Sequence, residues 1–193
     1  MKRKTILITC IMMLLLTALS ILAMERTPKN KIPDEVLQMV KNRNTANSLA
    51  KGYYTINEQG FQAHYIVDIE ESKTYKRLKD LLYPVDHWLF VAELDGRPDS
   101  ILHLGKTNEY MSKYSTLAFT GGGEMFYHTL ALADPSSKND VVLLHYAGNY
   151  YFMRDDLLYL VPKSKSDYEM NPYVADTPIK SADFLKLVLN NKN

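Results

Sequence analysis

The sequence predicts an α+β protein with a mainly antiparallel sheet, an N-terminal helix, one or two mid-chain helices and a C-terminal helix, preceded by one transmembrane or signal helix. Three observations predict this organisation. Residues 5–24 form an uncharged, mostly apolar run behind a basic head. Short segments with strand periodicity follow in neighbouring pairs, one of them joined by an Asp-Gly turn. Segments with helical apolar spacing lie at both ends of this region and within it.

The N-terminal run has the length and the flanking charge of a membrane segment. Three basic residues at positions 2–4 precede residues 5–24, which include no charged side chain. An apolar stretch of about twenty residues matches the roughly 30 Å hydrocarbon core of a bilayer and is long for a signal peptide. We expect residues 1–24 to be a retained anchor, with a signal peptide as the alternative. Ala18 and Ser20 have the small-residue spacing of a cleavage site, so cleavage would follow Ser20.

The single cysteine, Cys10, lies inside this run. The residues that follow it therefore contain no disulfide, no thiolate metal ligand and no cysteine nucleophile. Lipidation of Cys10 is not expected, because Thr9 replaces the small residue that should precede it and few apolar residues come before. The basic head favours a cytoplasmic N-terminus, although basic residues also follow the run and make the positive-inside rule ambiguous here.

The rest of the chain predicts one domain outside the cytoplasm. Residues 25–32 are a polar linker, and residues 33–193 are long enough for a single extracytoplasmic α+β domain with its own core. Setting aside the three basic residues at positions 2–4 from the total of 23 leaves 20 basic residues against 22 acidic ones. This near-neutral balance lacks the basic surface that nucleic acid requires, so nucleic acid is not an expected partner.

The first elements of the domain are a helix and a hairpin. Pro33 and Gly52 bracket an apolar stripe that predicts a helix over residues 34–51, whose polar middle indicates packing through one narrow face. Alternating residues on both sides of Asn-Glu-Gln-Gly predict a hairpin over residues 53–69. Residues 70–82 then have helical spacing, which ends before a proline.

A second hairpin is the clearest element of the chain. Asp95-Gly96 joins the apolar runs 87–94 and 100–104, and Asp-Gly in this position is the strongest short-range hairpin signal. The remaining expected elements are a strand over 109–119, a helix over 124–133, strands over 141–146, 150–154 and 157–161, and a helix over 182–189 capped by Ser181.

Two sets of residues are candidate binding sites. Gly121–Gly123 precede a helix, where backbone amides can bind phosphate, but the lysine and serine of a P-loop are missing, so we interpret the glycines as a flexible linker. The histidines at positions 64, 87, 103, 128 and 145 are widely scattered. His87 and His103 are placed to meet across the second hairpin, with Glu93 as a possible third ligand. Because no pair has the short spacing of zinc ligands, we predict no metal site and no cofactor.

Catalytic signatures are missing from the sequence. It contains no Gly-x-Ser-x-Gly or His-Glu-x-x-His motif. Glu70-Glu71 and Asp155-Asp156 are adjacent carboxylates, but the side chains of neighbouring residues normally point apart and do not share one site. No catalytic residue is therefore predicted. The composition is instead rich in tyrosine, with 14 residues against six phenylalanines and one tryptophan. Most of these are expected in ordinary sheet packing, and a tyrosine-rich face is the first candidate for a ligand or partner groove.

The favoured hypothesis is a non-catalytic binding module outside the cytoplasm of a bacterial cell, held in the cell membrane as a single-pass protein by residues 5–24. Its partner would be a protein, a peptide or a component of the cell wall. One alternative is a cell-envelope hydrolase, which would bring two carboxylates, or histidine and carboxylate, together in a concave pocket. A second is an immunity-type inhibitor or a protein secreted after signal cleavage, which differs only in its partner or its release.

Overall fold

The computed structural model describes residues 31–49, 54–67, 69, 74–106, 113–136, 140–172 and 176–191. The membrane or signal segment expected at residues 1–24 and most of the expected linker lie outside these ranges. Within the described ranges, no helix combines the length and the apolar character needed to cross a bilayer.

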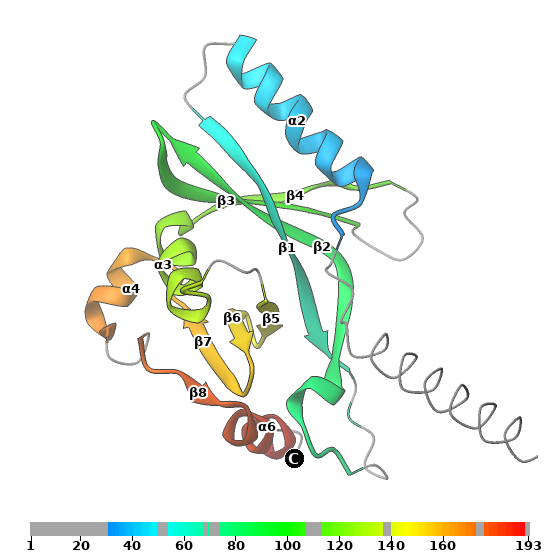
Figure 1. Cartoon of the computed structure of the whole chain (residues 1–193), viewed down its shortest axis with the longest axis vertical. Coiled ribbons are helices and arrows are strands. Elements are labelled where there is room, and N and C mark those ends of the chain that lie inside the picture. The colour runs from blue at the N-terminus through cyan, green and yellow to red at the C-terminus, as the bar shows by residue number, and fades with distance from the viewer. Residues whose placement is uncertain are drawn as a thin grey trace, which may run out of the picture. The chain divides into compact units, whose positions relative to one another are not determined.

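One eight-stranded sheet dominates the fold, with the strand order β4-β3-β2-β1-β5-β6-β7-β8 (Figure 1). Neighbouring strands pair antiparallel except β1 and β5, which are parallel, so the expected mainly antiparallel α+β class is confirmed. The strands are β1 (Tyr54–Ile66), β2 (Leu82–Leu94), β3 (Arg97–Gly105), β4 (Ser115–Gly121), β5 (Val142–Tyr146), β6 (Asn149–Arg154), β7 (Leu157–Val161) and β8 (Ile179–Lys180). The helices are α2 (Asp34–Leu49), the 3₁₀ helix η1 (Leu78–Leu81), α3 (Gly123–Ala133), α4 (Lys165–Met170) and α6 (Ser181–Asn190).

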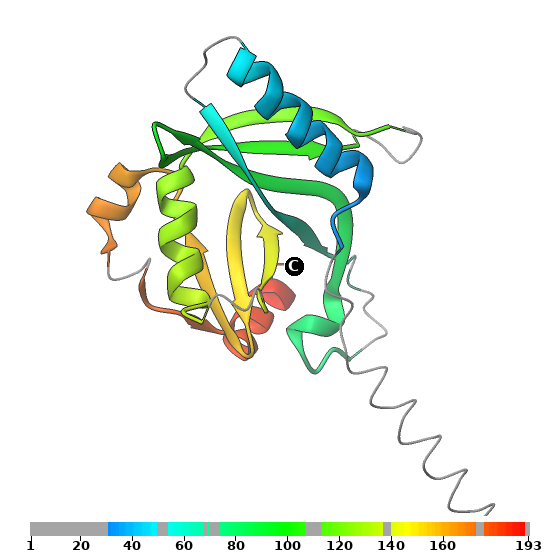
Figure 2. The ribbon, with the colours of Figure 1, turned by 45° about the horizontal axis from the view of Figure 1, so that its top comes forward.

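Three buried clusters hold helices against the two faces of the sheet. α2 places Val36 and Val40 on Trp88 and Phe90 of β2. α6 packs Phe184 and its neighbours on the β5–β7 strands, together with the leucines of η1. α3 lies on the other face of the sheet, between β2–β3 and β6–β7 (Figure 2). The sheet therefore curls around α3, and α2 and α6 cover the outside of its two halves.

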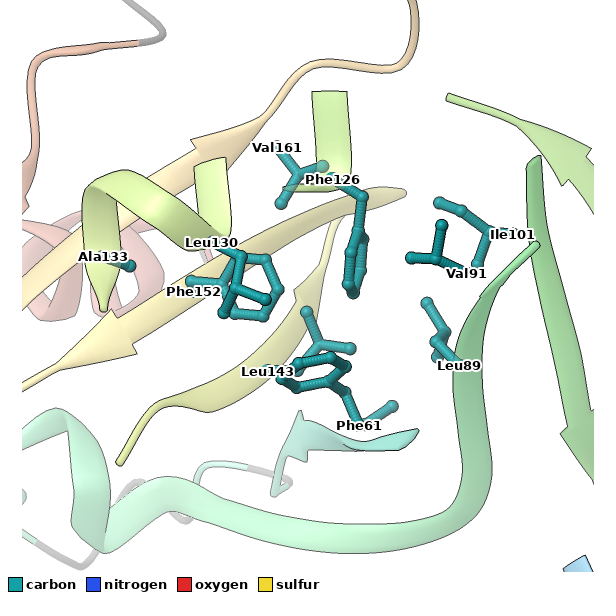
Figure 3. Packing of buried hydrophobic residues seen from close by; sticks show 11 residues of the cluster. Phe61, Leu89, Val91, Ile101, Phe126, Leu130, Ala133, Leu143, Phe152 and Val161 are labelled. Atoms are coloured by element: carbon teal, nitrogen blue, oxygen red, sulfur yellow. The ribbon is translucent and has the colours of Figure 1, made fainter. Parts of the chain in front are cut away.

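Three phenylalanine rings join the two halves of the sheet at the centre of the curl. Phe126 of α3 lies 5.5 Å from Phe61 of β1 and 4.8 Å from Phe152 of β6, and Phe61 and Phe152 are 5.4 Å apart, measured between ring centroids. All three pairs meet edge to face, a favourable geometry for aromatic rings. Figure 3 shows the three rings converging from three separate elements. We refer to them as the phenylalanine cluster.

The glycines at the start of α3 do not form a linker, which corrects the sequence-based interpretation, because Gly121 is the last residue of β4 and Gly123 is the first of α3. A Cβ atom on Gly123 would lie 2.7 Å from the backbone nitrogen of Ser100, so only glycine lets the helix approach β3 this closely. Gly122 has a φ of 95°, in the left-handed region that glycine adopts without strain. The chain can therefore turn directly from β4 into α3.

The polar middle of α2 has a role that its sequence did not reveal. The side-chain amide of Asn44 donates to the carbonyl oxygen of Ile56 (2.8 Å) and accepts from the Ile56 N–H (2.7 Å). Asn47 donates to the carbonyl oxygen of Tyr54 (3.2 Å). β5 pairs with β1 only at Ala63 and His64, so these asparagines act in place of a neighbouring strand for the first part of β1.

Two sequence-based predictions near β1 are wrong. The hairpin expected over residues 53–69 is one strand, in which the turn-forming residues are accommodated as an irregularity of the β1–β2 pairing between Ile56 and Gly60. The missing side chain of Gly60 leaves room for the ring of Phe90, which a Cβ atom would approach to 2.5 Å. Long-range pairing with β2 therefore overrides the local turn signal.

The second wrong prediction is the helix over residues 70–82. Residues 70–73 lie outside the described part of the chain, and residues 74–82 do not form an α-helix. Its apolar residues Leu78 and Leu81 are buried, but through the single turn η1. Pro84 then lies inside β2 instead of ending a helix.

Other predicted elements needed smaller corrections. The expected strand at 109–119 is described only from Ser115, as β4. Ser181 is the first residue of α6 and its cap is Lys180, while the Ser181 hydroxyl bonds Asp156 at 3.3 Å. α4 and β8 were not predicted. The 87–94 and 100–104 hairpin, the helix at 124–133 and the strands β5, β6 and β7 are confirmed.

Removing the ring of Phe126 is expected to lower the free energy of unfolding by about 3–5 kcal/mol, because the cavity would separate both halves of the sheet from α3. Phe119→Ala is the matched control, since that ring is 47% exposed and should cost about 1 kcal/mol or less. Urea unfolding of the full chain can be followed by the fluorescence of Trp88, the one tryptophan, which is 2% exposed. Equal losses in Phe126→Ala and Phe119→Ala would contradict the central role of the cluster.

Candidate functional site

A second layer of aromatic side chains lies beside the phenylalanine cluster on the same face of the sheet. Residues two apart along a strand have their side chains on the same face of the sheet. Each aromatic residue of this layer is therefore placed on that face by a buried residue two positions away. These buried residues belong to the central core and are Leu89, Ile101, Leu143, Ala63 and Phe152. Two positions along the same strands are His87 of β2, His103 of β3, His145 of β5, Tyr65 of β1 and Tyr150 of β6. We call these five residues the His/Tyr layer.

Two histidines of this layer are hydrogen-bonded to each other, as their positions in the hairpin indicated. The Nε2 atom of His87 lies 3.0 Å from Nδ1 of His103, and the Nε2 atom of His103 lies 3.0 Å from the Thr120 hydroxyl oxygen of β4. A neutral imidazole has one donor and one acceptor nitrogen, so protons must point the same way along this chain, toward Thr120 or toward His87. The three groups therefore satisfy one another without any charge.

The layer continues across the curl to the other half of the sheet. The ring centroids of His103 and Tyr150 are 6.1 Å apart, those of Tyr150 and His145 are 4.7 Å apart, and those of His145 and Tyr65 are 5.1 Å apart. Tyr65 in turn lies 6.3 Å from Tyr83 of β2. Ring contacts thus run from β3 through β6 and β5 to β1, and the step from β3 to β6 joins strands that are not neighbours in the sheet.

Burial keeps this layer uncharged at neutral pH. It lowers the pKa of His87 to about 4, with the nearby His103 and His145 as further causes. The pKa of His103 is lowered to about 4 by burial and by His145, and burial also lowers the pKa of His145. Burial raises the pKa of Tyr150 to about 12. Because no carboxylate forms an ion pair with these imidazoles in the described part of the chain, loss of hydration decides their state.

Glu93, proposed from the sequence as a third ligand beside His87 and His103, is not part of this group. It pairs with Pro98 near the Asp95-Gly96 turn, six residues along β2 from His87. Among the residues that the structure describes, no group of three or more histidine, cysteine or acidic side chains is placed to hold a metal ion.

The remaining histidines lie outside the layer. His64 of β1 has its Nδ1 atom 3.1 Å from the carbonyl oxygen of Gln62, and burial lowers its pKa. His128 of α3 bonds Asp176 at 3.0 Å, and the Tyr168 hydroxyl of α4 donates to the same carboxylate at 3.0 Å. This bond with His128 lowers the pKa of Asp176. His128 and Asp176 are both partly exposed and line neither of the pockets described below, so we interpret them as a tether of the chain around α4 to α3.

The acidic pairs singled out in the sequence do not form a site in the described structure. Glu70 and Glu71 lie outside the described residues. Asp155 occupies a turn with a φ of 52°, while Asp156 is bonded to Ser181 at the start of α6. The two neighbouring carboxylates therefore have different surroundings.

An open pocket of about 300 Å³ adjoins the His/Tyr layer at the carboxyl ends of the parallel strands β1 and β5. The pairing of these strands ends at His64 and Leu144, and beyond this point they border the pocket from two sides. α6 contributes the third side. The described lining residues, none of which has a charged side chain, are Tyr65, Ile66, Val67, Ile69, His145, Tyr146, Ala147, Val188 and Asn191.

A second pocket of about 400 Å³ lies beside the start of α6 and has a different character. Lys76, Arg77 and Lys180 line it together with Asp156. Arg77 is bonded to Asp80 at 2.7 Å, and Asp156 accepts hydrogen bonds from Ser181. Since several of its polar groups are already engaged with one another, we take the first pocket as the candidate functional site.

No family model matches the sequence, and neither a curated protein nor a solved structure matches this chain. The function of the site is therefore argued from its own residues.

Sequence reasoning found part of this site. It placed His87 and His103 together, because one hairpin determines their distance. It did not connect them with His145, Tyr65 and Tyr150, whose meeting depends on the curl of the sheet. One signal was available: each of these aromatic residues is two positions from an apolar residue in a segment with strand periodicity.

Acidification is expected to lower the free energy of unfolding between about pH 6.5 and pH 4, since the unfolded histidines gain protons in this range and the buried ones do not. Stability from this source is complete above pH 6.5, and it is lost as the pH falls toward the lowered pKa. His87→Gln keeps a hydrogen-bonding side chain but cannot titrate, so it should lose roughly 2 kcal/mol less than the wild type between about pH 6.5 and 5.

His128→Gln is the control for this measurement, because it removes a histidine outside the layer. Urea titrations at a series of pH values compare the three proteins. A pH dependence of His87→Gln equal to that of the wild type would contradict the role of the layer.

Proposed function

We propose that the protein is a non-catalytic binding module, held by residues 5–24 in a bacterial cell membrane with its domain outside the cytoplasm, and that the pocket between β1, β5 and α6 takes its ligand. The single observation that supports this most strongly is the character of that pocket. It combines aromatic and aliphatic side chains with a few neutral polar groups, which is typical of small-ligand sites.

The arrangement of possible catalytic groups favours binding over hydrolysis. A hydrolase needs an acid and a base, or a nucleophile and its base, within reach of one substrate atom. In the described structure the histidine bonded to a carboxylate is His128, which does not line either pocket, and His145 in the candidate pocket has tyrosine rings as its neighbours. A ligand in this pocket would be held by contacts and hydrogen bonds.

The tether can be tested directly on the protein made in bacterial cells. We expect intact protein, with its N-terminal segment present by mass spectrometry, in the membrane fraction and resistant to extraction by alkaline carbonate. An apolar run of bilayer length is the reason. A mature chain that begins after Ser20 and is released from the membrane would instead support the secreted alternative and overturn the tether.

Ligand binding at the pocket can be tested with a matched pair of variants at the C-terminal end of α6. Asn191 lines the pocket, and the neighbouring Asn190 is exposed and does not. Fractionated cell-wall digests are added to the full chain, and the melting temperature is followed by circular dichroism. A fraction that contains the ligand should raise the Tm of the wild type and of Asn190→Trp, because a ligand that binds only the folded state stabilises it. Asn191→Trp should not respond, since its indole fills the pocket.

Three results would contradict the proposal. If every fraction acts equally on Asn191→Trp and Asn190→Trp, or if none raises the Tm of the wild type, the pocket is not the ligand site. If mass spectrometry shows that a stabilising fraction is cleaved during incubation, the protein is a hydrolase and not a binding module.

A further inference from the structure

We infer that the ligand of this pocket is a neutral saccharide, bound through one sugar ring. The inference rests on the proposed function, because it names the chemical class of ligand for the same site. It follows from the shape of the pocket, the kinds of surface that line it and the hydrogen-bonding capacity of its polar groups.

The apolar part of the lining suits the face of a sugar ring. Three of the lining residues, Tyr65, His145 and Tyr146, are aromatic, and four, Ile66, Val67, Ile69 and Val188, are aliphatic. The faces of a pyranose ring expose C–H groups, which pack against aromatic and aliphatic surfaces as other apolar groups do. The volume of about 300 Å³ is at the small end of the range for ligand pockets, so it suits one ring and not an extended polymer.

The polar part of the lining suits hydroxyl groups. His145 has one donor and one acceptor nitrogen when neutral, and the tyrosine hydroxyls both donate and accept. The side-chain amide of Asn191 donates weakly to the Tyr146 hydroxyl at 3.5 Å, which leaves the amide oxygen of Asn191 as an acceptor. A sugar hydroxyl also donates and accepts, so each of these groups finds a complementary partner on the ring.

Charged and purely apolar ligands fit less well. A charged ligand would lose hydration at a site where no described lining side chain has the opposite charge. A purely apolar ligand would cover His145, the tyrosine hydroxyls and Asn191 without hydrogen-bonding them, which costs about 1–3 kcal/mol for each group left unsatisfied. A neutral, hydroxyl-rich ring avoids both costs.

The β1–β5 pairing ends beside the site. The register between the two strands ends at His64 and Leu144, although both strands continue for two more residues. The divergence of the strands beyond this point provides the opening, because continued pairing would close it.

The test uses isothermal titration calorimetry of the full chain in detergent with defined probes. The neutral probes are maltotriose and tri-N-acetylchitotriose, and the charged probe is chitotriose without its acetyl groups, which is cationic at neutral pH. We expect one of the neutral probes to bind, and Asn191→Trp to weaken that binding by about tenfold or more while Asn190→Trp leaves it unchanged. If tri-N-acetylchitotriose binds, the cationic trisaccharide without acetyl groups should bind at least about tenfold more weakly.

The outcomes separate this inference from the proposed function. If cell-wall fractions stabilise the wild type and Asn190→Trp but not Asn191→Trp, while neither neutral probe binds, the pocket is a ligand site but the saccharide inference is wrong. Binding of an acetylated and amidated tripeptide that depends on Asn191, without saccharide binding, would assign the site to peptides instead. Equal saccharide binding by both tryptophan variants would also overturn the inference, because the sugar would then bind elsewhere.

Discussion

The contact among Phe61, Phe126 and Phe152 determines the shape of the sheet, and the candidate site depends on that shape. These rings come from β1, α3 and β6, so their packing closes a loop that includes both halves of the chain. Without α3 in its centre, the sheet would have no apolar surface to curl around on this face. Because Gly123 lets α3 approach the β3 backbone, the position of the helix is fixed from its first turn.

The curl has a consequence for the next layer of side chains. It brings the ring centroid of His103 on β3 to 6.1 Å from that of Tyr150 on β6, although three strands, β2, β1 and β5, lie between them in the sheet order. Burial lowers the pKa of His87 from 6.5 to about 4, which corresponds to roughly 3 kcal/mol against protonation. The neutral side chains of His87, His103 and Thr120 satisfy one another by hydrogen bonds instead. The layer is thus polar in composition and uncharged in practice.

Much of this fold is encoded locally, and the parts that are not explain the errors in sequence-based prediction. The Asp95-Gly96 turn and the alternation around it determine one hairpin by themselves, so the meeting of His87 and His103 was predictable. The turn-like residues before Gly60 were misleading, because the pairing of β1 with β2 along both flanks is worth more than a local turn. The contacts of His145 and Tyr150 with the first half depend on the parallel pairing of β1 with β5, which local periodicity does not encode.

The position of the pocket follows from how β1 is covered along its length. Its first residues bond to the asparagines of α2, Asn57 bonds to the Tyr127 hydroxyl of α3, and Ala63 and His64 pair with β5. The next stretch of the same strand borders the pocket. A strand of 13 residues beside a strand of five cannot be paired along its whole length, so the remainder needs other partners. Helices supply partners at one end of β1, and the other end borders the pocket that we propose as the ligand site.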